Sequence, residues 1–466
     1  MKTVFLLQLR DHLTSLRCQL SLGLLLLFFV ANGVTYSWKM ERLGREQRLI
    51  EAENQRRYEG IGSVDQAVGR ACRVASRALG TEFVSEGGAN WLADAVEVPV
   101  GTGAGFLAAT NLLTTNHWLR RFDVVDWTLV VRLVLSFLAV VLAYDSISGE
   151  AESGTLRQAL ANPIGRGRYL TGKLLAHLAV LLGGVLVGML LGLLILSLSG
   201  VLVLDGQAVQ AALFFVGAAA ALAALFLGLS LAVSSLAPDS TTALVVLVMA
   251  WAGLVVLAPQ ASYPLAVHLV PVTTDVRGRQ DQVIADARQG LAGQGIGLRG
   301  PEAGRVDGFA LEREYGRRLE AAQAEAEEIG READRQALRR YSVARAVNLL
   351  SPGFAFQYSV EALLGTGIAR RERFLTQARQ YREEIRAFLR EQDAADPESP
   401  HVLYVAGYLS QRPLAAAAIP RFREQRPSLA ERVAAGAVPL VILTLEAAVG
   451  VLFALWAFNR RDLTQG

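Results

Sequence analysis

Residues 144–173, YDSISGEAESGTLRQALANPIGRGRYLTGK, contain residue types at a spacing that could bind a nucleotide. Gly167, Gly172 and Lys173 have the G-x-x-x-x-G-K spacing of a phosphate-binding loop, whose lysine reaches the terminal phosphates. Such a loop follows a strand and continues with a serine or threonine that binds magnesium. Here Leu174 comes next, no strand pattern precedes, and a membrane span begins at once. We therefore expect no nucleotide site and no ATPase activity in this chain.

Other catalytic and metal-binding patterns give no support for an enzyme. The sequence has five scattered histidines, no H-E-x-x-H metalloprotease motif and no G-x-S-x-G nucleophile motif. Its two cysteines, Cys18 and Cys72, are expected on opposite sides of a membrane, which excludes a disulfide between them. The formal net charge of +3 gives no support for a nucleic-acid partner. We expect no catalytic residue, metal or cofactor in this chain.

The composition predicts an all-α polytopic membrane protein with sizeable aqueous segments. Its hydrophobic fraction of 52% and mean hydropathy of +0.33 are too high for a soluble protein, while 19% charged residues are too many for lipid alone. Apolar runs near the length of a bilayer predict six transmembrane helices. They cover residues 19–38, 127–142, 170–198, 211–236, 241–258 and 434–458. Spans three to five are rich in small residues, which predicts close packing, and Asp239 or Ser240 is expected to cap the fifth.

Basic residues near the span ends predict the orientation, because they collect in cytoplasmic loops. They precede the first span, lie within residues 144–173 and follow the last span as Arg460 and Arg461. Both termini are then cytoplasmic. The chain divides into an interfacial helix with the first span, a first outer segment, spans two to five, a second outer domain, and the sixth span with its tail. These parts are residues 1–38, 39–126, 127–258, 259–432 and 433–466.

Residues 4–17 predict an amphipathic helix that lies along the inner leaflet before the first span. A secretory signal peptide is the alternative, although no A-x-A-like cleavage site follows and further spans continue downstream.

The two extracytoplasmic segments give unequal signals. The first opens with a charged helix continuing from the first span and then becomes rich in Gly, Ala and Val, without a fold that we can assign. The second is predicted to be mainly α-helical, with helices at residues 307–349 and 372–390 among dense mixed charge. Solvated helices folding on each other and a partner- or cargo-binding domain both fit this pattern.

The charged residues of the 144–173 stretch must lie outside the lipid. Asp145, Glu150, Glu152 and the nearby arginines could not all sit in hydrocarbon at a few kcal/mol each. Residues 153–161 predict a short amphipathic helix, which stops before Pro163.

Two ionisable residues fall inside predicted spans and are functional candidates for that reason. Arg132 lies a turn or two into the second span, where it could snorkel to the outer interface. Glu446 lies near the middle of the sixth span. Two roles are possible for Glu446. It could form a structural hydrogen bond or a pair with Arg132, or it could be a polar element of a translocation path.

The 144–173 stretch resembles the ABC-2-type permeases, the membrane subunits of ABC exporters. Their signature after the second span is an acidic residue, Ile-Ser-Gly-Glu, a variable pair, Gly-Thr-Leu, a short helix, and a Pro-Ile pair before basic residues and Gly-Lys. The matching residues here are Asp145, Ile147, Ser148, Gly149, Glu150, Gly154, Thr155, Leu156, Pro163, Ile164, Gly172 and Lys173. The initial helix, the six spans and the closing FNRRDL fit the same family. Residues 349–367 further resemble a subset with a large outer domain before the last span.

The resemblance implies a type V exporter fold with a coupling helix, at residues 145–172, that docks on a separate ATP-binding subunit. That subunit would bind ATP and Mg. The coupling residues would be Asp145, Gly149, Glu150, Glu152, Gly154, Thr155, Leu156, Leu160 and Pro163. Glu150 and Glu152 would meet basic groups on the motor, while Leu156 and Leu160 would be apolar anchors. The resemblance also implies a dimer with a second copy or a sibling permease, in the lipid of a bacterial or archaeal cytoplasmic (inner) membrane.

Three functions follow as hypotheses. The first is a permease that exports or extracts a substrate by ATP-driven alternating access. The second is a mechanotransmission subunit that passes motion to a periplasmic or cell-surface partner without moving cargo. A sensor or anchor without a motor is the third.

Overall fold

The computed structural model describes residues 1–70, 72–76, 80–86, 95–101, 108–110, 125–161, 163–202, 206–272, 274–300, 304 and 307–461. Its α-helices are α1 (Lys2–Thr14), α2 (Leu16–Glu59), α3 (Val64–Val68), α5 (Trp127–Leu129), α6 (Ser136–Ala143), α7 (Ser148–Glu152), α8 (Thr155–Ala161), α9 (Arg166–Leu198), α10 (Gly206–Leu236), α11 (Ser240–Trp251), α12 (Ala258–Leu269), α13 (Val276–Gly293), α15 (Ala310–Asn348), α16 (Pro352–Leu364), α17 (Ile368–Ala394) and α18 (Leu429–Arg460). Two π-helical turns, η2 (Val130–Leu135) and η3 (Ala252–Leu257), and a 3₁₀ turn, η4 (Ala416–Ala418), complete the helices. The strands are β1 (Cys72–Ala75), β2 (Ala95–Val98) and β3 (Ala108–Thr110).

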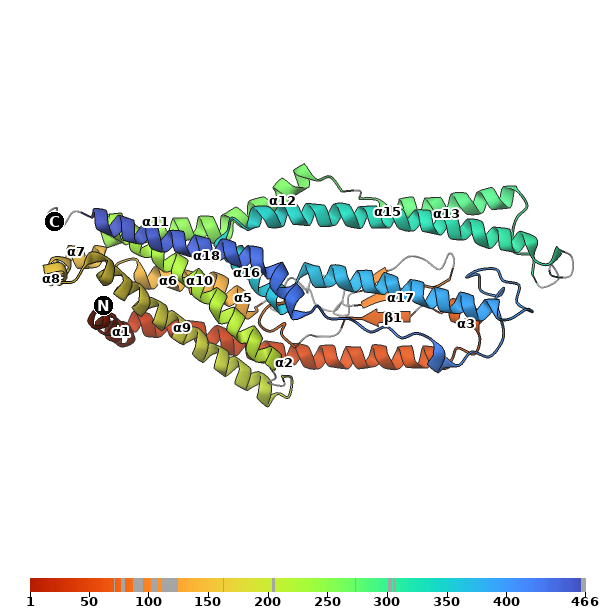
Figure 1. The fold of residues 1–466 in the computed structure, drawn as a ribbon, viewed down its shortest axis with the longest axis horizontal. Helices are drawn as coiled ribbons and strands as arrows, with labels where there is room; N and C mark the ends of the chain where they lie inside the picture. The colour runs from red at the N-terminus through yellow and green to blue at the C-terminus, as the bar shows by residue number, and fades with distance from the viewer. Residues whose placement is uncertain are drawn as a thin grey trace.

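The molecule is elongated, with α1, the α7–α8 segment and the end of α18 gathered at one end, which we call the terminal end (Figure 1). A bundle of helices follows, and the distal part of the chain lies beyond it. In the distal part, α13 and α15 form one arm, while the second half of α2, the small sheet and α17 lie together below it (Figure 1).

Six helical stretches within the described residues are long and apolar enough to cross a membrane. They are Leu16–Glu59, Trp127–Glu152, Arg166–Leu198, Ala208–Leu236, Ser240–Leu269 and Leu429–Arg460. This confirms the predicted all-α polytopic membrane protein. The fifth stretch continues through η3 and α12, so the boundary predicted at residue 259 lies inside a continuous helix.

Glycines let the bundle helices approach closely, as their number in the spans predicts. A Cβ atom on Gly188 of α9 would lie 2.6 Å from the Phe29 ring of α2. A Cβ on Gly228 of α10 would lie 2.6 Å from the backbone carbonyl carbon of Gly450 in α18. Larger residues at either position would push these helices apart.

The second and fifth spans each contain a π-helical turn, and a side chain next to one meets a side chain next to the other. Trp251, before η3, donates through its indole nitrogen to Ser136 Oγ, 2.9 Å away and directly after η2. Ser136 Oγ also donates to the Arg132 carbonyl inside η2. Such turns free backbone groups and often mark functional positions; the sequence did not predict them.

The charged helix predicted to continue from the first span is present, because α2 runs on without a break into the distal part (Figure 1). There α2 packs beside an antiparallel sheet of order β1-β2-β3, in which Cys72 pairs with Val98 and Ala95 with Thr110. The sheet forms part of a core shared with α17, and the hydroxyls of Tyr58 and Tyr381 lie 2.6 Å apart within it. This small sheet lies in the segment to which the sequence analysis assigned no fold.

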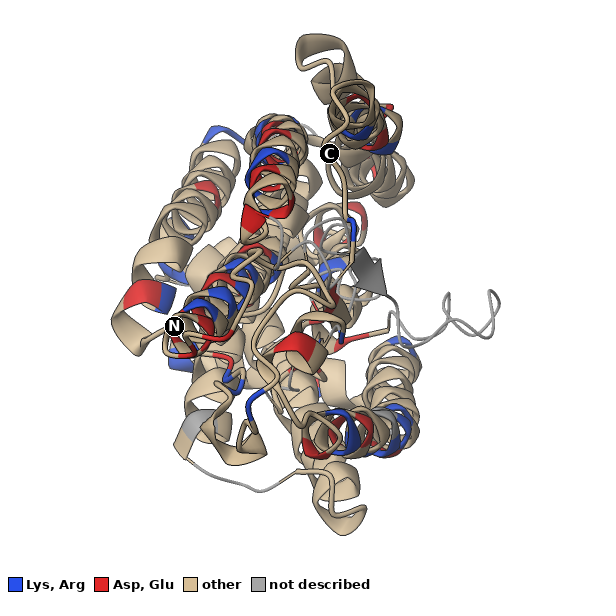
Figure 2. Cartoon of the chain, turned by 90° about the vertical axis from the view of Figure 1, so that its right-hand side faces the viewer, with Lys and Arg blue, Asp and Glu red and all other residues tan. Residues whose placement is uncertain are grey.

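The helices predicted at residues 307–349 and 372–390 correspond to α15 and α17. Acidic and basic residues alternate along the distal helices (Figure 2). Arg382 of α17, although 2% exposed, pairs with Glu327 of α15, and Arg379 pairs with Asp334. The mixed charge therefore ties α17 to the neighbouring arm as well as solvating it.

The helix predicted at residues 4–17 is present as α1 and ends earlier, at Thr14, while its position along the membrane stays a prediction. Ser15 has an extended backbone and caps α2 by accepting a hydrogen bond from the Cys18 N–H. The chain therefore turns at Ser15, and α1 packs on the start of α9, where a Cβ on Gly172 would lie 3.2 Å from Val4.

Candidate coupling and intramembrane sites

The predicted coupling segment is two short helices rather than one. The sequence predicts a helix over residues 153–161, whereas the structure has α7 and α8 separated at Ser153 and Gly154. Gly154 has φ = +74°, a left-handed conformation that only glycine adopts without strain. The chain turns there, and the backbone of the turn is exposed at the terminal end.

Glu150 of α7 is held by the foot of α9. Its Oε1 accepts from Lys173 Nζ at 2.7 Å and its Oε2 from the Tyr169 hydroxyl at 2.5 Å. Lys173 also donates to the Ser146 carbonyl at 2.7 Å, and its side chain is only 2% exposed. Both oxygens of Glu150 thus already accept a hydrogen bond within the chain, and its contact with a basic group of a motor stays a prediction.

Three further contacts fix the segment to other helices. Arg17 of α2 pairs with Asp145 at 2.9 Å. Glu152 accepts from the Ser240 N–H at the start of α11, where Asp239 caps the helix as predicted. Ser234 Oγ of α10 accepts from the Ser148 N–H at 3.0 Å.

The apolar face of the segment packs on the bundle. Leu156 is 2% exposed and lies in a cluster with Tyr169, Leu231 and Phe458; Leu160 packs at its edge. Burying a leucine contributes roughly 2 kcal/mol. Leu156 thus anchors α8 to its own chain, and its contact with a motor stays a prediction.

The exposed face of the segment is what remains for a partner. Its exposed residues include Glu152, Ser153, Gly154, Thr155, Arg157, Gln158, Ala161 and Pro163. Gly149 stands behind it, where a Cβ would lie 3.6 Å from Ser240 Oγ. Docking at this face stays a prediction.

Two histidines behind the segment were not singled out from the sequence. His177 is fully buried on α9, one turn after Lys173, and its Nε2 lies 3.0 Å from Ser146 Oγ. The ring of His12 on α1 meets it edge-on at 4.3 Å between centroids, and burial lowers the pKa of His12. The spacing of Lys173 and His177, four residues apart on one helix face, is the signal that could have found them.

Arg132 and Glu446 do not form the pair that the sequence left open. Arg132 donates to Gln357 of α16, and its guanidinium lies 4.5 Å from the Phe354 ring centroid. Glu446 Oε2 is buried without a hydrogen-bond partner among the described residues. Their positions explain this. Arg132 lies at the distal end of the second span, where it contacts α16, whereas Glu446 lies midway along α18. A role of Glu446 in a translocation path stays a prediction.

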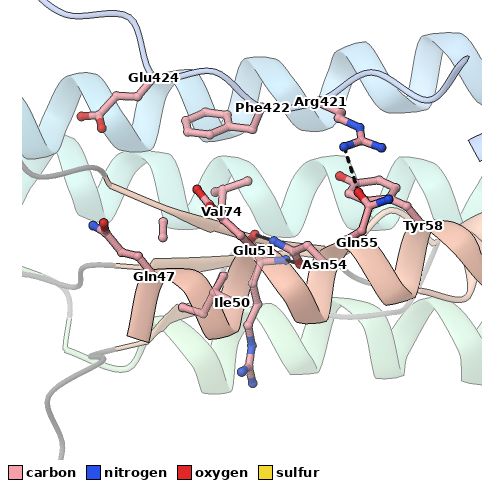
Figure 3. Close-up of a pocket in the computed structure, with 12 residues that line it drawn as sticks. Gln47, Ile50, Glu51, Asn54, Gln55, Tyr58, Val74, Arg421, Phe422 and Glu424 are labelled. Carbon is pink, nitrogen blue, oxygen red and sulfur yellow. Dashed lines mark hydrogen bonds between the residues drawn. The ribbon is translucent and has the colours of Figure 1, made fainter. Parts of the chain in front are cut away.

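A groove of about 340 Å³ lies in the distal part, between α2, β1 and the returning segment at residues 421–424 (Figure 3). Arg421 donates to Gln55 at 3.0 Å across it, and Tyr58 and Phe422 supply aromatic walls. Asn54 bonds the backbone N–H and carbonyl of Arg73 at its floor. Many of the polar groups that line the groove thus bond to one another.

The sequence as a whole matches a known family. Residues 4–463 match the family described as ABC-2 family transporter protein. The chain belongs to the ABC-2 family. The match covers the coupling segment, all six candidate spans and the distal part, so these are features of one permease.

Two curated relatives share part of this permease. A "Probable ABC transporter permease protein NosY" from Pseudomonas aeruginosa is 34% identical over 122 residues, which are 26% of this chain and 44% of that protein. A protein of the same name from Stutzerimonas stutzeri is 46% identical over 55 residues, 12% of this chain and 20% of that protein. The chain thus spans less than half the length of the curated relatives it matches. The family identifies a multi-pass membrane permease subunit of an ABC transporter, whose ATPase is usually a separate partner.

Proposed function

We propose that this permease exports or extracts a substrate across the membrane, driven by a separate ATP-binding subunit that docks on the exposed α7–α8 turn. The subunit binds the ATP and Mg, and this chain carries no catalytic residue. The turn lies in the cytoplasm with both termini, in the inner membrane of a bacterium or archaeon. Two permeases, identical or siblings, form the membrane part.

The observation that carries the proposal is the set of contacts behind the turn. Glu150 joins it to α9, Glu152 to the start of α11, Ser148 to α10, and Leu156 to Phe458 near the end of α18. A push on the exposed turn therefore reaches four spans through short contacts. A loop that merely connected two spans would not need them.

The second candidate is mechanotransmission, and α2 favours it. This helix runs unbroken for 44 residues from Leu16 to Glu59, about 66 Å at 1.5 Å per residue. It joins the terminal end to the sheet and to the groove of Figure 3. Motion of the bundle could thus reach a periplasmic partner without cargo crossing the membrane.

Co-purification with the ATP-binding subunit tests the docking site. Thr155→Arg places a bulky charge on the exposed turn, and Ser342→Arg makes the same change on exposed α15. We expect Thr155→Arg to lose the ATP-binding subunit and Ser342→Arg to keep it. Retention by both variants would contradict docking at the turn. Transport into vesicles by the intact complex then separates the candidates, because mechanotransmission predicts ATP turnover without cargo movement.

A further inference from the structure

A small arginine-rich pocket of about 60 Å³ lies where α16 ends and α17 and α18 begin. This junction is between the bundle and the distal part (Figure 1). Arg345 of α15, Arg373 of α17 and Arg432 of α18 all line it, together with Tyr358 and Pro427. Three guanidinium groups from three different helices therefore converge on one opening.

These three arginines retain unused hydrogen-bond donors. Within the described residues, the Arg345 side chain makes no hydrogen bond and only lies 4.9 Å from the Tyr358 ring centroid. Arg432 makes one long bond of 3.4 Å to the Leu363 carbonyl, and its Nε is buried without a partner. Among the residues that the structure describes, Arg373 pairs with Glu431 alone, at 3.5 Å. An arginine has five N–H donors, so most of them are available to a ligand.

A fourth arginine in the pocket wall, Arg370, has a structural role and differs from the other three in its partners. Arg370 pairs with Glu82 at 3.0 Å and with Glu424 at 3.4 Å. Its charge is compensated by two carboxylates from elsewhere in the chain, unlike the charges of Arg345 and Arg432.

The acidic residues of the pocket neutralise the three guanidiniums only in part, because Glu431 is the partner of Arg373 alone. Glu431 receives the Ser428 N–H at 2.7 Å in a capping box at the start of α18. Glu361 is 7% exposed and bonds to Gln357 at 2.6 Å, and burial raises its pKa to about 7. The pocket is therefore positive near neutral pH.

The pocket adjoins an exposed apolar surface on a candidate membrane span. Ala435 of α18 lines it, and Val438, Leu445 and Val449 continue down the same helix face at steps of three, seven and four residues. Those three side chains are 62%, 60% and 65% exposed, at the start of an apolar span. A molecule with an anionic head in the pocket could place its chains along this stripe.

We propose that Arg345, Arg373 and Arg432 form a binding site for a phosphate-bearing anion, with the headgroup of a membrane lipid as its source. Guanidinium forks match phosphate oxygens in pairs, and charge-assisted bonds of this type are the strong ones. Basic pockets beside membrane helices bind anionic headgroups by the same chemistry.

Lipid retention by the full-length permease in nanodiscs tests this site. Wild type, Arg345→Gln/Arg432→Gln and the control Arg317→Gln/Arg331→Gln are compared in phosphatidylcholine with added phosphatidylglycerol. The control arginines are exposed on α15 and pair only with neighbours on that helix. We expect native mass spectrometry to show phosphatidylglycerol bound to wild type and control, and bound about tenfold more weakly to the pocket variant, since two charge-assisted contacts are lost.

A second arm uses inorganic phosphate in pure phosphatidylcholine nanodiscs and follows thermal stabilisation. Stabilisation of wild type but not of the pocket variant, without a difference in lipid retention, would support the anion site and identify a free anion as its ligand. Equal behaviour of all three proteins in both arms would overturn the proposal. If the double variant does not fold, Arg345→Gln alone serves, because its side chain donates no hydrogen bond within the described residues.

Discussion

Lys173 Nζ lies 2.7 Å from Glu150 Oε1, and this ion pair joins the foot of α9 to the α7 helix of the coupling segment. The lysine is 2% exposed and the glutamate 29% exposed, so the two partners differ in their access to water. The glutamate also receives the Tyr169 hydroxyl. Removing either partner should therefore have unequal consequences.

We expect Glu150→Gln to destabilise the permease more than Lys173→Met. Glu150→Gln leaves the buried ammonium of Lys173 with neutral acceptors only, which should cost about 3 kcal/mol. Lys173→Met leaves a carboxylate that water and Tyr169 still solvate in part, and it should have about half that effect. Thermal unfolding in detergent measures both. Strictly additive losses in the double variant would contradict a direct pair.

Gly154 should tolerate asparagine better than valine. Its φ of +74° strains a β-branched residue by about 1–2 kcal/mol, whereas asparagine adopts this region readily. We expect Gly154→Val to weaken co-purification of the ATP-binding subunit and Gly154→Asn to retain most of it. No Cβ contact lies within 4 Å of Gly154, so crowding does not complicate the comparison. Equal retention by the two variants would show that the turn conformation is unimportant for docking.

Close helix packing predicts a contrast between two glycines of α10. A Cβ on Gly228 would lie 2.6 Å from the backbone of Gly450, whereas a Cβ on Gly217 would meet nothing within 4 Å. We expect Gly228→Ala to lower stability by about 2 kcal/mol, because a backbone cannot move aside, and Gly217→Ala to be neutral or slightly stabilising. Thermal unfolding of the two variants side by side checks this. Similar melting temperatures would mean that α10 and α18 do not pack as closely as described.

The features that could be predicted from the sequence are those whose residue pattern lies within a single helix. The six apolar runs, the Asp239 cap and the charged periodicity of α15 are each set by neighbours a few residues away. The structure therefore differs from the prediction mainly at boundaries, such as the extension of the fifth span to Leu269.

The features that were missed depend on distant partners or on local insertions. Glu150 and Lys173 were both noted, yet their pairing requires the chain to turn between them, which their types do not reveal. Strands of three or four residues carry too short an alternation to predict β1 to β3. The π-helical turns at Val130 and Ala252 change neither composition nor polarity, so no pattern marks them.

Glu361 should make the stability of the permease depend on pH between about 4.5 and 7. Burial raises its pKa to about 7 from 4.5, despite the Gln357 hydrogen bond and the charges of Arg345 and Arg132; Asp126 adds to the increase. The folded state therefore favours the neutral acid, and the stability that it contributes is fully present below pH 4.5 and lost as the pH rises through 7. The full loss is about 3 kcal/mol, from 1.36 kcal/mol per pKa unit.

Glu361→Gln should remove this part of the pH dependence. Melting temperatures of wild type and variant across pH 5 to 8 measure it, and the two curves should converge at acid pH. A wild-type excess of stability that grows with pH would have the wrong sign and would contradict a buried neutral carboxyl.

Glu446 should be more important for transport than for stability. Its Oε2 is buried without a partner among the described residues, and an unpaired buried polar atom lowers stability. We expect Glu446→Leu to raise the free energy of unfolding by about 1 kcal/mol, because it removes this atom from an apolar span. If the carboxyl belongs to a translocation path, the same variant should reduce vesicle transport severalfold. Thr444→Val, two residues earlier on the exposed side of α18, is the control and should leave transport unchanged. Unchanged transport by Glu446→Leu, together with the gain in stability, would contradict a role of Glu446 in the translocation path. It would instead indicate that Glu446 pairs with a residue of the second permease.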